Sequence, residues 1–204
     1  NWDSQLYYYS TTLDTLGDLR KWGSTWSYND LSTYNFRSYE AKPGKDNYII
    51  KFMRLNPSSV ENRQVMVYRT ALLYLRYAEA VNRLGKPNLA MAVLKNGLTR
   101  INMNNPKIIP AKEKSDPLPG YMNFTDVIFD NNKGIRSRGC GNLEYDTLHY
   151  IIPANVDTMT YVEDLIVNEL ALETAFEGNR FHDLMRIAIR RDDNSYLANR
   201  VAAK

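Results

Sequence analysis

The chain contains very little of the chemistry on which many enzymes and metal proteins depend. It has one cysteine, Cys140, and two histidines, His149 and His182, among 204 residues. One cysteine cannot form an internal disulfide, and this set is too small for a typical zinc site. The sequence has no glycine-rich phosphate loop, no nucleophile elbow and no His-Glu-x-x-His motif. We therefore expect no catalytic residue, no metal and no cofactor.

Strong charge and long apolar runs are missing as well. The formal net charge is +3, from 26 basic and 23 acidic residues that are spread evenly. This balance is too weak to predict a nucleic-acid partner or a charged membrane surface. No apolar run approaches the roughly 20 residues that span a bilayer. The chain begins at Asn1 without a signal peptide, so we expect it to be a fragment of a longer protein.

Aromatic residues are abundant instead, with fifteen tyrosines and three tryptophans. Residues 1–66 form a loop-rich aromatic segment, with a short predicted strand at 48–53. Trp22, Trp26 and Tyr28 are the candidate ligand-binding residues, because flat rings in loops stack on sugar rings or peptide side chains. The same rings could instead anchor the loops on a helical scaffold.

A pair of helices is predicted in residues 67–104. Apolar residues cover most of the circumference of a helix at 67–84, which predicts packing on two sides. Gly85 ends this helix, and a second one is expected at 88–103. The placement of small and large residues in the pair is similar to a tetratricopeptide repeat. Residues 105–159 hold five of the eight prolines and four of the ten glycines, with a glycine-bounded loop at 134–142, and should be mainly irregular.

The C-terminal segment, residues 160–204, is predicted to be helical. Thr160 and Glu163 have the spacing of a capping box, and apolar residues up to Phe176 follow the helical period. Gly178 is the expected stop, since glycine takes the left-handed conformation without strain. Asn179 can cap a second helix, whose predicted apolar face is Phe181, Leu184, Met185 and Ala188.

Charged residues in this segment predict a structural network. Carboxylates four residues apart lie on one stripe of a helix, and they need cations nearby. These carboxylates could also suggest acid–base catalysis or a di-metal site. Arginines lie at helical spacing from them, however, and this favours ion pairing. We expect the network to hold the last helices to the 67–103 pair through Arg69 or Arg76. Its predicted members are Glu173, Glu177, Arg180, Asp183 and Arg186.

Two helical stretches resemble the SusD/RagB family of outer-membrane nutrient-binding lipoproteins. The first is VYRTALLYLRYAEAVNRLGKPNLAMAVLKNGL at 67–98, and the second is ELALETAFEGNRFHDLMRI at 169–187. The second stretch departs from the family pattern at Leu170, because arginine is usual at that position. The positions in register with the pattern are Glu169, Glu173, Glu177, Gly178, Arg180, Asp183, Leu184 and Arg186.

The resemblance implies a mainly α, tetratricopeptide-like scaffold with long loops and little strand, as the C-terminal half of a longer protein. It implies a non-catalytic receptor at the bacterial cell surface, held to the outer membrane by an N-terminal lipid anchor. Such a receptor captures a glycan or a peptide and passes it to a SusC/RagA-like TonB-dependent transporter. The alternative is a helical protein–protein scaffold without a small ligand.

Overall fold

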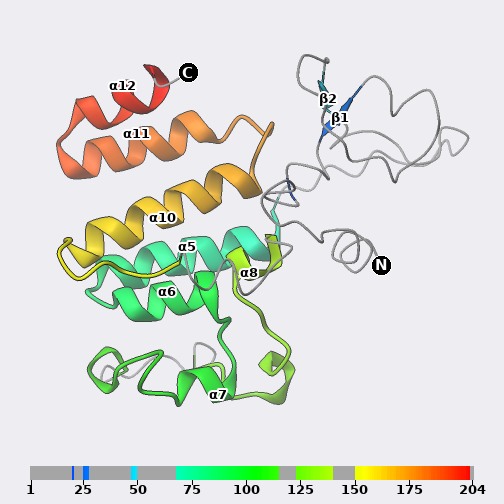
Figure 1. Cartoon of the computed structure of the whole chain (residues 1–204), viewed down its shortest axis with the longest axis vertical. Helices are drawn as coiled ribbons and strands as arrows, with labels where there is room; N and C mark the ends of the chain where they lie inside the picture. Colours follow the sequence, from blue (N-terminus) through cyan, green and yellow to red (C-terminus); the bar gives the residue numbers. More distant parts are fainter. Residues whose placement is uncertain are drawn as a thin grey trace, which may run out of the picture.

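The described part of the chain is mainly helical, as expected (Figure 1). The computed structural model describes Arg20, residues 25–27 and 47–49, and the stretches 68–114, 123–139 and 150–202. Two short strands, β1 (Thr25–Ser27) and β2 (Asn47–Ile49), pair in antiparallel register with Trp26 opposite Tyr48. The predicted strand at 48–53 therefore exists in part and begins one residue earlier. Its partner lies in a segment that the sequence predicted as loop, because pairing between distant strands leaves no local signal.

Helices α5 (Thr70–Arg83) and α6 (Pro87–Lys95) form the predicted pair. Between them Gly85 adopts a left-handed conformation with φ of 76°, and Pro87 occupies the first turn of α6. Leu75, Ala78 and Val81 of α5 are buried, as are all residues of α6 from Leu89 to Leu94. Helix α5 packs on two sides, as predicted, but not all of its apolar residues are buried. Helix α5 contacts α6 and α10, but Leu73 and Leu84 are 59% and 73% exposed.

The predicted helix at 88–103 is broken, and this prediction was wrong. Helix α6 ends at Lys95, and a separate short helix, α7 (Arg100–Met103), follows. The break lies at Gly97, which has φ of 81°. A Cβ atom on Gly97 would stand 2.5 Å from the carbonyl oxygen of Asn132. The helix is interrupted at Gly97 because the loop that carries Asn132 lies against it. Helical periodicity in the sequence gives no sign of such a long-range contact.

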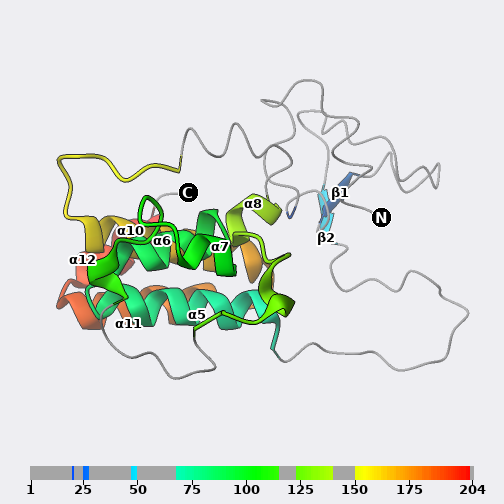
Figure 2. The same cartoon turned by 90° about the horizontal axis from the view of Figure 1, so that it is seen from below.

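The central segment contains short elements between irregular stretches. These are the 3-10 helices η1 (Ala111–Glu113) and η3 (Val127–Phe129) and the helix α8 (Ile135–Gly139). Part of the expected loop at 134–142 is therefore helical. Figures 1 and 2 both place α8 at one end of the α5–α6 pair, and α8 contacts both helices.

Helix α10 (Thr158–Glu173) begins differently from the predicted capping box. The N-cap is Asp157, whose carboxylate accepts the backbone N–H of Thr160 at 3.0 Å. Hydrogen bonds from the Thr160 hydroxyl and then from its N–H lower the pKa of Asp157. Glu163 does not reach back to a cap, because it is buried and pairs with arginines of the next helix.

Helix α10 also ends earlier than predicted, and a turn leads into α11 (Arg180–Arg191). Gly178 does have a left-handed conformation, with φ of 78°, but it lies five residues past the helix. Asn179 occupies the N-cap position without a side-chain hydrogen bond. Phe176 and Phe181, which were predicted to face the core, are 49% and 54% exposed, whereas Leu184 and Ala188 are buried. The apolar face of α11 is thus narrower than its sequence suggests.

The last helix, α12 (Asn194–Ala202), is anchored by Tyr196. Its hydroxyl donates to Asp164 Oδ1 at 2.9 Å, and the guanidinium groups of Arg191 and Arg200 lie 4.6 and 4.9 Å from its ring centre. Burial, followed by the hydrogen bond to Asp164, raises the pKa of Tyr196 to about 12.

From bottom to top of Figure 1 the helices appear in the order α6, α5, α10, α11 and α12, and α10 contacts α5, α6 and α11. Helix α10 lies between two apolar cores because it is apolar on two faces. Ile166 and Leu170 join the larger core with α5 and α6, while Val167 joins a smaller core with α11 and α12. Among the described residues, no helix combines the length and the apolar character needed to cross a bilayer.

Candidate functional site

The interface between α5 and α11 is built from charged side chains. Glu79 on α5 is 5% exposed, and its carboxylate pairs with Arg186 on α11 at 2.8 Å and with Arg83 on its own helix. Asp183 on α11 is 2% exposed and pairs with Arg76 at 2.7 Å and with Arg186 at 2.9 Å. Burial alone would lower the pKa of Arg186, but the hydrogen bonds that Arg186 donates to Glu79 and Asp183 outweigh burial and raise that pKa. We call these residues (Glu79, Asp183, Arg76, Arg83 and Arg186) the α5–α11 charge cluster.

The other predicted network residues, Glu173, Glu177 and Arg180, have partners outside this cluster. Arg69 pairs with Glu177 at 2.6 Å and also donates to the backbone carbonyl of Glu173. The Glu173 carboxylate pairs with Arg20 at 2.9 Å. Arg180 donates to the carbonyl oxygen of Val167 at 2.8 Å, and desolvation by burial lowers its pKa. Within the described part of the chain, Arg180 forms no ion pair.

Two further buried carboxylates on α10 were not among the predicted members. Glu163, 1% exposed, pairs with Arg191 at 2.7 Å and with Arg190. Glu169, 2% exposed, pairs with Arg20 at 2.8 Å and lies 3.3 Å from the Tyr150 hydroxyl. Each of these carboxylates is paired with a guanidinium, so neither has the environment of a general acid or base. Their chemistry is structural: they join α10 to α11 and to the N-terminal segment.

The side chains of the candidate ligand-binding aromatics lie outside the described part of the structure. Trp22 and Tyr28 lie outside the described residues, and of Trp26 only the backbone, in β1, is described. Cys140 and His149 also lie outside them, and His182 is exposed. Among the described residues, no group of three or more potential ligands could hold a metal ion.

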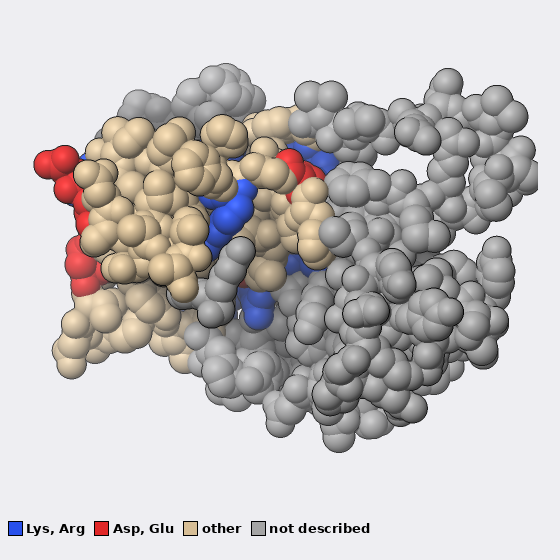
Figure 3. Space-filling model, turned by 90° about the horizontal axis from the view of Figure 1, so that it is seen from above, with Lys and Arg blue, Asp and Glu red and all other residues tan. Residues whose placement is uncertain are grey.

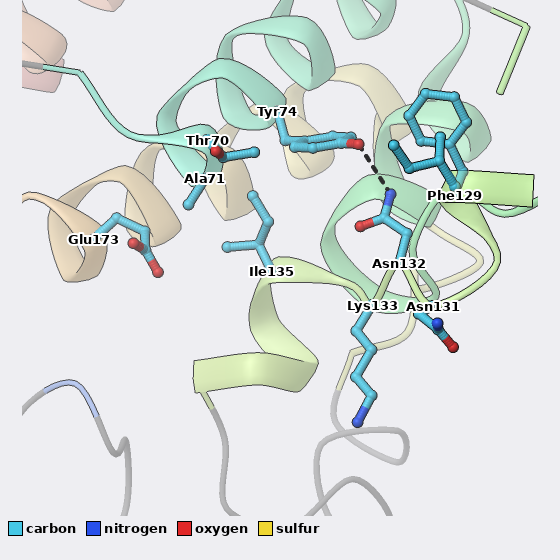
Figure 4. Close-up of a pocket in the computed structure, with 10 residues that line it drawn as sticks. Thr70, Ala71, Tyr74, Phe129, Asn131, Asn132, Lys133, Ile135 and Glu173 are labelled. Atoms are coloured by element: carbon cyan, nitrogen blue, oxygen red, sulfur yellow. Dashed lines mark hydrogen bonds between the residues drawn. The ribbon is translucent and has the colours of Figure 1, made fainter. Parts of the chain in front are cut away.

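A pocket of about 340 Å³ opens between α5, the loop after η3, and α8 (Figure 4). It lies at the N-terminal end of α5. We call it the Tyr74 pocket. Its lining residues are Thr70, Ala71, Tyr74, Ile128, Phe129, Asn131, Asn132, Lys133, Ile135 and Glu173.

The aromatic side of the Tyr74 pocket rests on a buried ring. Phe124 is 8% exposed and lies edge-on to Phe129, with ring centres 5.1 Å apart. It also packs against Tyr74 at 6.1 Å and edge-on against Tyr77 at 5.7 Å. Phe124 has φ of 50°, an unusual conformation for a bulky residue that costs free energy and persists only where the surroundings enforce it. Burial raises the pKa of Tyr77 to about 12.

The polar side of the Tyr74 pocket is fixed by Asn132. Its side-chain nitrogen donates to the Leu98 carbonyl and to the Tyr74 hydroxyl, each at 3.2 Å. A carbonyl accepts only, so the contact with Leu98 determines which end of the amide carries the nitrogen. Both amide hydrogens are used, and the Asn132 carbonyl oxygen is turned toward the space between Tyr74 and Ile135 (Figure 4).

The loop that carries Asn132 is held close to the end of α6. A Cβ atom on Gly134 would stand 2.2 Å from the backbone of Lys95, so only glycine permits this approach. The Ser137 hydroxyl donates to the Lys95 carbonyl at 2.6 Å. Farther along, Arg100 and Asp130 form an exposed ion pair. The same contacts that break the 88–103 helix therefore also shape the pocket.

Sequence reasoning missed the Tyr74 pocket and Arg20. The local signal at the pocket is the run Asn131-Asn132-Lys133-Gly134, which is typical of a turn and indicates no ligand. Arg20 lies 149 residues from Glu169, and no sequence pattern links them.

The described surface carries charges of both signs. In the view of Figure 3, most described side chains are uncharged. Acidic ones lie at one edge and in a small group near the middle, where basic side chains lie close by. On this face the described basic side chains do not merge into one large patch, in keeping with the net charge of +3.

The chain is similar to one family of known proteins. The model of the SusD family, named SusD_RagB, matches residues 8–203. No curated protein and no solved structure matches the chain. Proteins of the SusD family are generally non-catalytic nutrient-binding proteins that work with TonB-dependent transporters and are typically associated with the outer membrane at the cell surface. Because the match covers nearly all of its length, the chain belongs to the SusD family.

Proposed function

We propose that this protein captures a glycan or a peptide at the cell surface and delivers it to a TonB-dependent outer-membrane transporter. The observation that carries the proposal is the family match over residues 8–203, which includes the aromatic loops as well as the helical scaffold. In this role the full-length protein is held at the outer membrane by an N-terminal lipid anchor and performs no chemistry on the nutrient.

The charged side chains support a binding role over a catalytic one. The carboxylates of Glu79, Glu163 and Asp183 are nearly fully buried and paired with guanidinium groups. A general acid or base must reach a substrate and exchange a proton with it. Side chains that are fixed between helices serve to hold a scaffold in shape.

We propose that Trp22, Trp26 and Tyr28 contribute the stacking surface for the nutrient. The antiparallel pairing of β1 with β2 gives the segment around Trp26 a regular backbone support. Stacking of a flat ring, with a few polar contacts beside it, suits recognition of a glycan or a peptide side chain.

A helical scaffold that binds another protein is the second candidate function. Exposed apolar side chains on α5 and α7 favour it, because Leu73 is 59% exposed and Ile101 is 77% exposed. Such side chains are also ordinary when they are scattered singly on a surface. The two functions differ in whether a small ligand binds without any protein partner.

Calorimetric titration of the full-length protein with oligosaccharides and short peptides tests the proposal. We expect binding to the parent protein, and a loss of affinity of at least tenfold in Trp22→Ala and Trp26→Ala. Tyr68→Ala is a matched control, since Tyr68 is an exposed aromatic on the helical scaffold. If no saccharide and no peptide binds, while a protein partner does, the scaffold function is correct. Unchanged affinity in both tryptophan variants would move the ligand site away from these loops.

A further inference from the structure

The Tyr74 pocket offers hydrogen-bonding groups that the protein does not use. Within the described part of the chain, no hydrogen bond engages the Thr70 hydroxyl or the side-chain carbonyl oxygen of Asn132, whereas the Asn131 side chain points away from Tyr74 (Figure 4). The Tyr74 hydroxyl accepts from Asn132, and its own hydrogen has no acceptor among the described residues. Polar groups that face a cavity without a partner are available to a ligand.

The charged side chains at the pocket, Glu173 and Lys133, are not available to a ligand in the same way as these neutral groups. The Glu173 carboxylate pairs with Arg20 at 2.9 Å. The Lys133 side chain points away from Tyr74 (Figure 4). The rest of the lining combines neutral polar groups of Thr70, Tyr74 and Asn132 with apolar side chains, which are Ala71, Ile128, Phe129 and Ile135. A ligand that matches this surface is uncharged, because a buried charge needs an opposite charge as partner.

The shape of the pocket further limits which class of uncharged ligand can fit. Figure 4 shows the Tyr74 ring edge-on, so one of its faces is turned toward the side on which Ile135 and Asn132 lie. A flat ring surface with hydrogen-bonding groups around it suits a sugar ring, whose C–H face is apolar and whose hydroxyls donate and accept. The volume of about 340 Å³ is at the small end of the range for ligand pockets, roughly 300–1,000 Å³. It suits one or two sugar units better than a folded peptide segment.

The pocket wall is also rigid before any ligand arrives. The Asn132 amide is held at both hydrogens, Gly134 allows its loop to press on the end of α6, and Phe124 supports the aromatic side at the cost of a left-handed backbone. Rigid placement of polar groups reduces the entropy lost on binding. Strain that is kept at one buried residue is typical of functional sites.

We propose that the Tyr74 pocket is a saccharide site on the helical scaffold that takes one or two units of a neutral sugar. The sugar ring packs against the face of Tyr74, and its hydroxyls bond to Asn132, Thr70 and the Tyr74 hydroxyl. This inference rests on the proposed function and makes it more specific, since it selects a neutral saccharide over a peptide at this position.

The test uses calorimetric titration of the full-length protein with maltose, cellobiose, xylobiose and mannobiose. Glucuronic acid and trialanine serve as charged and peptide comparison probes. Thr70→Trp places a large ring at the exposed rim of the pocket, and we expect it to weaken disaccharide binding at least tenfold. Tyr74→Phe removes one hydroxyl and should weaken binding about fivefold, the usual effect of one lost hydrogen bond. Tyr68→Phe is the matched control and should bind as the parent does.

Each outcome decides the inference. Binding of a neutral disaccharide that both pocket variants weaken, with circular dichroism and melting temperature unchanged, supports it. Disaccharide binding that Thr70→Trp leaves intact overturns the pocket site while nutrient capture stands. A pocket that takes trialanine or glucuronic acid instead overturns the choice of a neutral sugar. If none of the disaccharides binds to the parent protein, the inference is wrong. The proposed function then depends on the longer oligosaccharides and peptides and on the Trp22 and Trp26 variants.

Discussion

The guanidinium of Arg186 on α11 lies 2.8 Å from Oε2 of Glu79 on α5, and the two residues are 107 positions apart in the chain. Glu79 is also in contact with Arg76 at 3.3 Å and with Arg83. One buried carboxylate therefore contacts three guanidinium groups and ties α11 to α5. Removing its charge leaves Asp183 as the only carboxylate of the α5–α11 charge cluster to compensate those three cations.

We predict that Glu79→Gln lowers the free energy of unfolding by about 2–3 kcal/mol. Loss of one partner of a fully buried pair costs roughly 3–5 kcal/mol, and the three arginines are about one-third exposed, so solvent reduces the effect. Urea unfolding measures the change. Asp192→Asn is the matched control, because it neutralises an exposed carboxylate at a left-handed position that asparagine tolerates. Equal stability of the two variants would mean that the α5–α11 charge cluster contributes nothing.

The second prediction compares two glycines that share a backbone conformation. Gly97 and Gly178 have φ of 81° and 78°, but a Cβ atom would be 2.5 Å from Asn132 O at Gly97 and would meet nothing within 4 Å at Gly178. Gly178→Ala should cost about 1 kcal/mol from backbone strain alone. Gly97→Ala should cost about 3 kcal/mol, because overpacking against the loop adds to the strain. Chemical unfolding of both variants measures the difference, and similar costs would show that the loop yields easily.

The third prediction concerns the stability of the protein in alkali. The pKa of Tyr196 is raised from its ordinary 10.0 to about 12, mainly by burial. A group with a raised folded pKa contributes stability that is fully present below its ordinary pKa and is lost as the pH rises through the folded one. The free energy of unfolding should therefore fall between about pH 10 and 12, and phenolate absorbance should appear in that window. The slope should be smaller in Tyr196→Phe and unchanged in Tyr68→Phe, whose ring is exposed. Identical slopes in the parent and in Tyr196→Phe would contradict the prediction.

The fourth prediction concerns the start of α10. Hydrogen bonds from the hydroxyl and the N–H of Thr160 lower the pKa of Asp157 from its ordinary 3.8. Stability from a lowered pKa is present above the ordinary value and is lost as the pH falls through the folded one. Asp157→Ala should therefore melt at a lower temperature than the parent at neutral pH, with a difference that shrinks below about pH 4. Glu163→Gln should show a loss of stability as well, but through its contacts with α11 and not through the cap. A difference for Asp157→Ala that stayed constant in acid would show that the carboxylate charge does not act there.

Local patterns in the sequence were enough for the helical scaffold. Most of α5, the turn at Gly85, the left-handed Gly178 and the helical character of residues 160–204 follow from periodicity and turn chemistry, which act over a few neighbouring residues. The family motif at 169–187 identified the family that the model match over residues 8–203 confirms.

Tertiary structure decided the features that depend on distant partners. Glu163 matches a capping box, yet it pairs with Arg190 and Arg191 because α11 packs against α10. The helical pattern through Gly97 is interrupted because the Asn132 loop lies against it. The same approach brings Tyr74, Phe129 and Asn132 together from two segments and forms a pocket. Sequence alone determines which conformations each segment favours, whereas long-range packing selects among them and assigns each buried charge its partner.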